Sequence, residues 1–135
     1  MIDEMCDLLR RETSAATALE GRMRVLELVV TAGEQRFVTL AVDEIEAASE
    51  RLADLELTRL LALAIAGMSP DLAADDLVKA IADPDDAQQL RTVVAELSEA
   101  TARLADTRQR AQVVVARGVG NSRERVRAAK EFALH

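Results

Sequence analysis

Apolar residues recur at alternating three- and four-residue spacing along three long stretches of the chain. The first stretch runs from Ile2 to Val30, and Glu12 is the only interruption of its seam. The second runs from Val38 to Leu55 and the third from Leu90 to Val114. Spacing of this kind, kept over several heptads, predicts amphipathic helices that pack lengthwise. We therefore expect an all-α protein.

Glycine and proline residues mark where these helices end. We expect a first helix over residues 2–32, ended by Gly33, and a second over 34–66, closed by Gly67 and Pro70. The turn between them is short, so the two helices must form an antiparallel hairpin. A short helix over 74–82 follows, and we expect it to cap the closed end of the bundle.

The sequence Asp83-Pro84-Asp85-Asp86 is a strong helix-start signal. Asp at the N-cap accepts hydrogen bonds from free amides, Pro fits the first helical position, and further carboxylates favour the positive end of the helix dipole. We expect a third long helix over 84–117. The predicted fold is an elongated antiparallel helical hairpin plus a third long helix, forming a three- to four-helix bundle or coiled coil over residues 1–117. Residues 118–135 are expected to form a mobile, basic, amphipathic tail.

The second half of the 34–66 helix departs from the single-stripe pattern. Leucine, isoleucine and alanine residues between Leu57 and Ile65 point to nearly every side of the helix. A helix that is apolar all round is normally covered all round. We therefore expect the following connection to pack there, in addition to the first helix.

Composition limits the classes of partner. Only Phe37 and Phe132 are aromatic, which excludes the stacking platforms that hold single-stranded nucleic acid. The net charge is −7, yet residues 100–135 carry eight Arg or Lys against three acidic residues. This polarity indicates that the C-terminal third meets something acidic, either a partner or the acidic helices beside it. The acidic pI and the lack of a helix-turn-helix spacing argue against nucleic-acid binding.

Cysteine usage and hydropathy indicate a cytoplasmic location. Cys6 is the only cysteine, so no intramolecular disulfide can form, as is usual in a reducing compartment. The longest apolar run, residues 60–67, is far shorter than the ~20 residues of a membrane-spanning helix. Acidic residues near the N-terminus are unlike a signal peptide. We expect no membrane insertion.

Candidate catalytic and metal-binding residues are few. His135 is the only histidine and stands at the last position, and Cys6 has no histidine within its helix. The acidic cluster at Asp83, Asp85 and Asp86 lacks the glycine and the distal glutamate of a calcium loop, and helix capping explains it. We expect no catalytic residue, no metal and no cofactor, so the protein is not expected to be an enzyme.

The third long helix carries a second apolar row beside its seam, at Val94, Val113, Val115 and Val119. The apolar side near its C-terminal end is therefore wider than one antiparallel partner would bury. A fourth helix or a second copy of the chain would cover it in a purely structural module. In a binding protein the same surface would take an amphipathic helix from a client.

Three stretches of the chain resemble the FlgN type of flagellar export chaperone, small helical proteins of the bacterial type III secretion pathway. The stretches are LVVTAGEQRFVTLAVDEIEAASERLADLEL, GMSPDLAADDLVKAIADPDDAQQL and ELSEATARLADTRQRAQ, and the resemblance covers most of residues 2–117. The chain departs from the family pattern at Asp106–Gln109, where members often carry an Asn, and in the glycine break after Arg117.

The resemblance implies a cytoplasmic chaperone that binds the C-terminal amphipathic segment of hook-filament junction proteins. Such a chaperone prevents premature assembly and delivers its client to the flagellar export apparatus. A self-associating coiled-coil structural or regulatory adaptor, including a homodimer, stays open as an alternative. The positions that we assign to client contact are Leu104, Ala111, Val114, Val115 and Val119, with Val126 and Phe132 as a mobile clasp.

Overall fold

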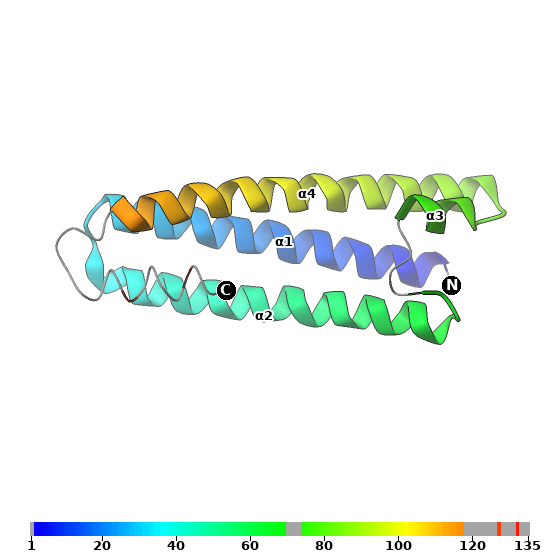
Figure 1. Ribbon diagram of the computed structural model, residues 1–135, viewed down its shortest axis with the longest axis horizontal. Coiled ribbons are helices and arrows are strands. Elements are labelled where there is room, and N and C mark those ends of the chain that lie inside the picture. The colour runs from blue at the N-terminus through cyan, green and yellow to red at the C-terminus, as the bar shows by residue number, and fades with distance from the viewer. Residues whose placement is uncertain (1, 70–73, 118–126, 128–131, 133–135) are drawn as a thin grey trace.

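The computed structural model describes residues 2–69 and 74–117 together with Arg127 and Phe132 (Figure 1). Its elements are α1 (Ile2–Thr31), α2 (Gln35–Ile65), α3 (Ala74–Lys79) and α4 (Pro84–Arg117). The predicted all-α bundle is confirmed, and the three long helices have nearly the expected bounds. The short helix ends at Lys79 rather than at residue 82. The predicted tail lies outside the described residues, apart from Arg127 and Phe132.

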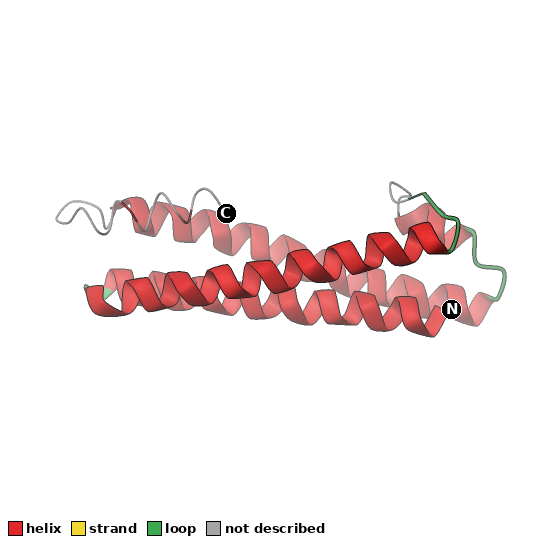
Figure 2. Ribbon diagram, turned by 90° about the horizontal axis from the view of Figure 1, so that it is seen from below, coloured by secondary structure: helices red, strands yellow, loops and turns green. Residues whose placement is uncertain are grey.

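Helix α1 is the centre of the molecule. It runs in the same direction as α4 and opposite to α2, and it lies between them (Figure 1). It packs lengthwise against both neighbours, whereas no comparable packing joins α2 and α4. Figure 2 shows α3 on one side of the long helices, at the end where α1 begins. The described helices therefore do not form a closed triangle, because α2 and α4 do not pack lengthwise against each other.

Glycine ends both helices of the hairpin, as predicted. Gly33 has φ 71° and Gly67 has φ 75°, values in the left-handed region that suits glycine. The amide of Glu34 donates to the carbonyl of Val29, and the amide of Met68 donates to the carbonyl of Leu63. These bonds are those of a Schellman motif, which satisfies the last carbonyls of a helix.

The start of α4 has the predicted cap. Oδ1 of Asp83 accepts a hydrogen bond from the amide of Asp85 at 2.9 Å, and its carbonyl accepts one from the amide of Ala87. Pro84 stands at the first helical position. Local chemistry alone therefore fixes where the third long helix begins.

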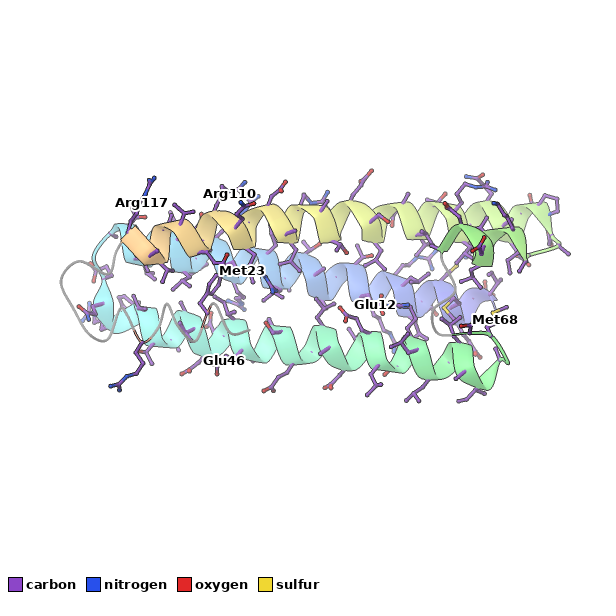
Figure 3. All side chains as sticks on the ribbon, in the orientation of Figure 1. Glu12, Met23, Glu46, Met68, Arg110 and Arg117 are labelled. Carbon is purple, nitrogen blue, oxygen red and sulfur yellow. The ribbon has the colours of Figure 1, made fainter. Side chains whose placement is uncertain are left out.

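The core consists of two apolar clusters along α1. One lies where α1 begins, at the end opposite the turn between α1 and α2, and there Leu77 and Val78 of α3 pack with residues of the long helices. The other extends along the C-terminal half of α1, from Ala16 to Val30. The seam of α1 is buried from Leu9 to Val30, and the burial includes Glu12 (Figure 3).

The expectation for the second half of α2 is confirmed in part: Leu63 belongs to the same buried cluster as Leu77 and Val78 of the following connection, but the opposite side of the helix is exposed. Leu57 and Leu61 are each 55% exposed and Ile65 is 87% exposed, whereas Leu63 is buried. None of the described elements covers the outer side of this segment. The connection after α2 therefore packs against one side of this segment, as expected, but the segment is not covered all round.

Candidate functional site: an apolar cluster completed by Phe132

The structure gathers most of the proposed client-contact residues into the core. Leu104, Ala111 and Val115 of α4 are buried and pack with α1 and α2, and Val114 is half-buried at the edge of the same cluster. They do not form an exposed ridge. Val119 and Val126 lie outside the described residues.

Phe132 occupies this cluster from outside the long helices. Its side chain is only 6% exposed, although it follows the end of α4 by more than a dozen residues. Burial of a phenylalanine side chain contributes on the order of 1.5–3 kcal/mol. The three long helices therefore form an apolar site between them, and the Phe132 side chain, which comes from a separate segment, fills it. The cluster that contains Phe132 also includes Met23 and Leu26 of α1, Val38 and Ile45 of α2, and Leu104 and Val115 of α4.

A second feature lies close to this cluster, on the side where α1 faces α4. Glu27, Asp106, Gln109, Arg110, Val113 and Val114 line an open hollow. Val113 is half-exposed there. Oε1 of Glu27 is buried, and none of the described residues donates a hydrogen bond to it. The hollow thus combines an apolar wall with a carboxylate oxygen that can accept a hydrogen bond from a partner.

An apolar pocket of about 90 Å³ lies at the opposite end of the molecule. It opens where the start of α1, the end of α2 and the short helix α3 come together, and Glu4 is the only charged residue among the described ones that line it. Met5 and Met68 are among its walls, and methionine side chains adapt readily to different shapes. Sequence reasoning missed this pocket because it depends on how three helix ends meet.

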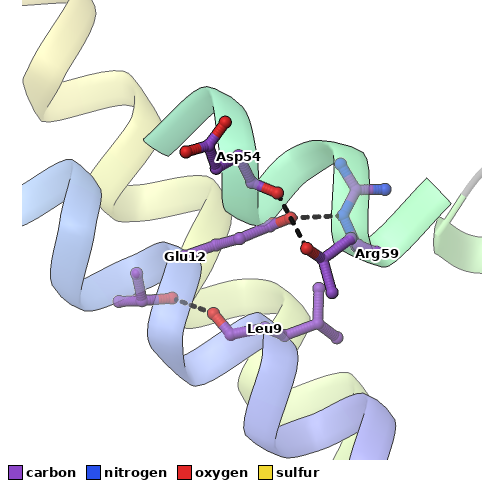
Figure 4. A network of polar contacts seen from close by, with 6 residues as sticks. Leu9, Glu12, Asp54 and Arg59 are labelled. Carbon is purple, nitrogen blue, oxygen red and sulfur yellow. Dashed lines mark hydrogen bonds and ion pairs between the residues drawn. The ribbon is translucent and has the colours of Figure 1, made fainter. Parts of the chain in front are cut away.

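Two polar networks cross the core of the bundle. Nε of Arg59 donates to Oε1 of Glu12 at 2.7 Å, which links α2 to α1 (Figure 4). Oγ1 of Thr107 donates to Oε1 of Glu20 at 3.0 Å, which links α4 to α1. Both carboxylates are nearly inaccessible to solvent, and each also fixes the register of a helix pair. Their geometry is that of structural supports.

The described residues offer no obvious catalytic or metal-binding group. Burial is the main cause that raises the pKa of the Cys6 thiol, which keeps it protonated and unreactive. No cluster of three or more His, Cys, Asp or Glu residues able to hold a metal ion occurs in the described ranges. Within those ranges, no helix is sufficiently long and apolar to cross a membrane.

Comparisons with known proteins give no relative for this chain. No family model matches it, and neither a curated protein nor a solved structure is significantly similar. Functional inference therefore rests on the site itself.

Proposed function

We propose that this protein is a non-enzymatic binding protein that holds an amphipathic helical segment of another chain. The observation that carries the proposal is the burial of Phe132 in a cluster built by α1, α2 and α4. A place that accepts one apolar side chain from a separate segment is suited to accept the apolar anchor of a partner helix. Helix-in-groove recognition uses anchors of this kind.

The surroundings of the cluster indicate the chemistry of the partner. Val113 and Val114 offer apolar contact in the nearby hollow, and Oε1 of Glu27 offers a buried acceptor. An amphipathic helix with an aromatic or aliphatic anchor and an adjacent hydrogen-bond donor would satisfy both features. A basic side chain would be the strongest donor, because hydrogen bonds between charged groups are roughly twice as strong as neutral ones.

The biological role that we propose is that of a cytoplasmic export chaperone. The resemblance to FlgN-type proteins supports this role, with the C-terminal segment of a hook-filament junction protein as the client. Holding that segment would prevent premature assembly and keep it available to the flagellar export apparatus. A disordered client segment that folds on binding gives up a few kcal/mol of interaction energy in ordering, which favours release at the export apparatus.

Peptide binding by the full chain tests this proposal. A labelled peptide from the C-terminal segment of a hook-filament junction protein is titrated with the protein, and fluorescence anisotropy reports binding. We expect Phe132→Ala to tighten binding, because the peptide no longer has to displace a buried phenyl ring. Val113→Asp should weaken binding at the hollow.

Phe37→Ala is the matched control, since Phe37 is the other phenylalanine and is 41% exposed near the start of α2. It should leave the affinity unchanged. A peptide that does not bind, or that binds equally to the wild type and to the Phe132 and Val113 variants, would refute the proposed site.

A further inference from the structure

A hollow on the surface of the hairpin gathers three arginine side chains. Asp7, Arg10, Arg11 and Ser14 of α1 line it together with Arg51 of α2. The four residues of α1 follow one another at three- and four-residue spacing, which places them on one side of the helix. All five residues are exposed. Positive side chains from two helices therefore converge at one place on the surface.

The charge of this hollow is opposite to that of the whole protein. Its described lining residues, three arginines and one aspartate, give a formal charge of +2, whereas the chain carries −7. Nη1 of Arg10 donates to Oδ1 of Asp7 at 3.3 Å, longer than the ~2.7–2.9 Å of a strong charged hydrogen bond. None of the described residues forms an ion pair or a hydrogen bond with Arg11 or Arg51. Two guanidinium groups therefore keep their donors available for a ligand.

Carboxylates near the hollow do not neutralise it. Glu50 and Asp54 lie close to Arg51 along α2, but neither is among the described residues that line the hollow. Glu12, from the same part of α1, is buried in the seam and binds Arg59. Like charges gathered on a helix surface repel one another. An anion held between the arginines would remove this repulsion.

Charge and hydrogen-bonding capacity indicate which anion fits. A single carboxylate carries one negative charge, whereas a phosphate monoester carries about −1.5 to −2 at neutral pH and has three strong acceptor oxygens. The dianion matches the charge of the hollow. Guanidinium groups bind phosphate oxygens through paired hydrogen bonds, and the hydroxyl of Ser14 can donate to an oxygen that they leave. The lining therefore suits a phosphate monoester better than a carboxylate.

We propose that the hollow at Asp7, Arg10, Arg11, Ser14 and Arg51 binds a phosphate monoester group. Arg11 and Arg51 donate to the phosphate from α1 and α2, and Ser14 donates to a remaining oxygen. Asp7 limits the affinity, because it neutralises Arg10. Since the site is open to solvent, binding weakens as salt is added. Phosphorylated small molecules and phosphorylated protein side chains both carry this group, and the experiment distinguishes them.

The phosphate site is separate from the proposed client site. It uses residues 7–14 of α1, whereas the cluster that contains Phe132 begins at Ala16 on that helix. Val113→Asp should therefore leave phosphate binding unchanged. A failure of one proposal is distinguishable from a failure of the other.

Nuclear magnetic resonance titration of the full chain with methyl phosphate tests the proposal. At constant ionic strength and about pH 7.5, where the dianion predominates, we expect saturable shifts of amide signals around the hollow. Arg11→Gln and Arg51→Gln should each weaken binding about tenfold, because each removes charge-assisted hydrogen bonds. Ser14→Ala should weaken it about threefold through loss of one neutral hydrogen bond. Asp7→Asn should tighten binding, since it releases Arg10.

Arg103→Gln is the matched control, because Arg103 is exposed on α4 and does not line the hollow. It changes the net charge by the same amount as Arg51→Gln and should bind methyl phosphate like the wild type. Circular dichroism should show wild-type helix content in every variant. Equal weakening by Arg103→Gln and Arg51→Gln would show that net charge alone attracts the anion, which would overturn the site.

A comparison of ligands tests the chemical class. Dimethyl phosphate and acetate, each with a single charge, should bind more weakly than methyl phosphate. A phosphoserine peptide that binds more tightly than methyl phosphate would assign the group to a protein, whereas equal binding would assign it to a small molecule; both results support the site. No saturable shift, an equal response to acetate, or unchanged binding in Arg11→Gln and Arg51→Gln would overturn the proposal.

Discussion

Arg59 of α2 and Glu12 of α1 form an ion pair inside the seam of the hairpin, with 2.7 Å between Nε and Oε1 (Figure 4). The Glu12 side chain is only 2% exposed and that of Arg59 is 28% exposed. Every other position of the α1 seam from Leu9 to Val30 is apolar. Because a buried carboxylate without its partner is costly, this pair allows only the register of α1 against α2 that brings the two residues together.

Removal of the cation should destabilise the protein strongly. We expect Arg59→Ala to lower the free energy of unfolding by about 3 kcal/mol, the lower end of the range for breaking a buried pair, because Arg59 is partly exposed. Urea denaturation measures the change. Arg10→Ala is the control, since Arg10 pairs with Asp7 on the surface and should change stability by less than about 1 kcal/mol. Equal effects of the two substitutions would contradict a structural role for the buried pair.

The same carboxylate should make stability depend on pH. Burial raises the pKa of Glu12 above its ordinary value of 4.5, and the bond and charge of Arg59 oppose this shift without cancelling it. The native state therefore holds the proton to a higher pH than the unfolded state does. Stability from this group is fully present below pH 4.5 and declines as the pH rises through the native pKa.

Glu12→Gln replaces the titratable carboxyl with a neutral amide, so comparison with the wild type isolates the contribution of Glu12 to the pH dependence of stability. The free energy of unfolding of the wild type, minus that of Glu12→Gln, should fall as the pH rises from below 4.5 toward neutrality. Urea titrations of both proteins across that range measure it. A difference that stays constant or rises with pH would show that the pKa of Glu12 is not raised in the native state.

The hydroxyl of Thr107 in α4 should contribute strongly to the stability of the fold. Its Oγ1 donates to Glu20 at 3.0 Å and accepts a bond from Arg110 at 3.0 Å. Thr107→Val removes both bonds and leaves a buried carboxylate oxygen with less support, so we expect a loss of about 1–3 kcal/mol in unfolding free energy. Thr92→Val on the same helix is the control, because Thr92 is exposed and its hydroxyl bonds locally to Gln88, donating to the carbonyl and accepting from Nε2. The prediction fails if Thr107→Val and Thr92→Val lose the same amount of unfolding free energy.

Two glycines should respond to alanine with opposite signs. Gly21 lies within α1, and a Cβ there would meet no atom within 4 Å, so Gly21→Ala should stabilise the protein by about 0.5–1 kcal/mol. Gly67 has equally open surroundings but φ +75°, so Gly67→Ala should destabilise it by about 1–2 kcal/mol through backbone strain. Thermal and urea unfolding of both variants give the comparison. Because space is equal at the two sites, effects of the same sign would contradict the backbone explanation.

The sequence predicted the helices of this protein more successfully than the site. Gly33, Gly67 and Asp83 act through their own backbone neighbours, so the ends of α1 and α2 and the start of α4 were evident from local chemistry. The candidate client residues were chosen from a wide apolar side of α4. Periodicity identified that side correctly, but Leu104, Ala111 and Val115 proved to be buried against α1, α2 and Phe132.

By itself, the sequence determined which residues form helices, where those helices stop, and which side of each is apolar, since all three depend on contacts within a few residues. Only the tertiary structure decided that α1 is central, that Glu12 meets Arg59, that Phe132 completes the core, and that Leu57, Leu61 and Ile65 stay exposed. The physical reason is that an apolar pattern records the preference of a side chain to leave water. It does not specify which distant helix, or which other molecule, packs against that side chain.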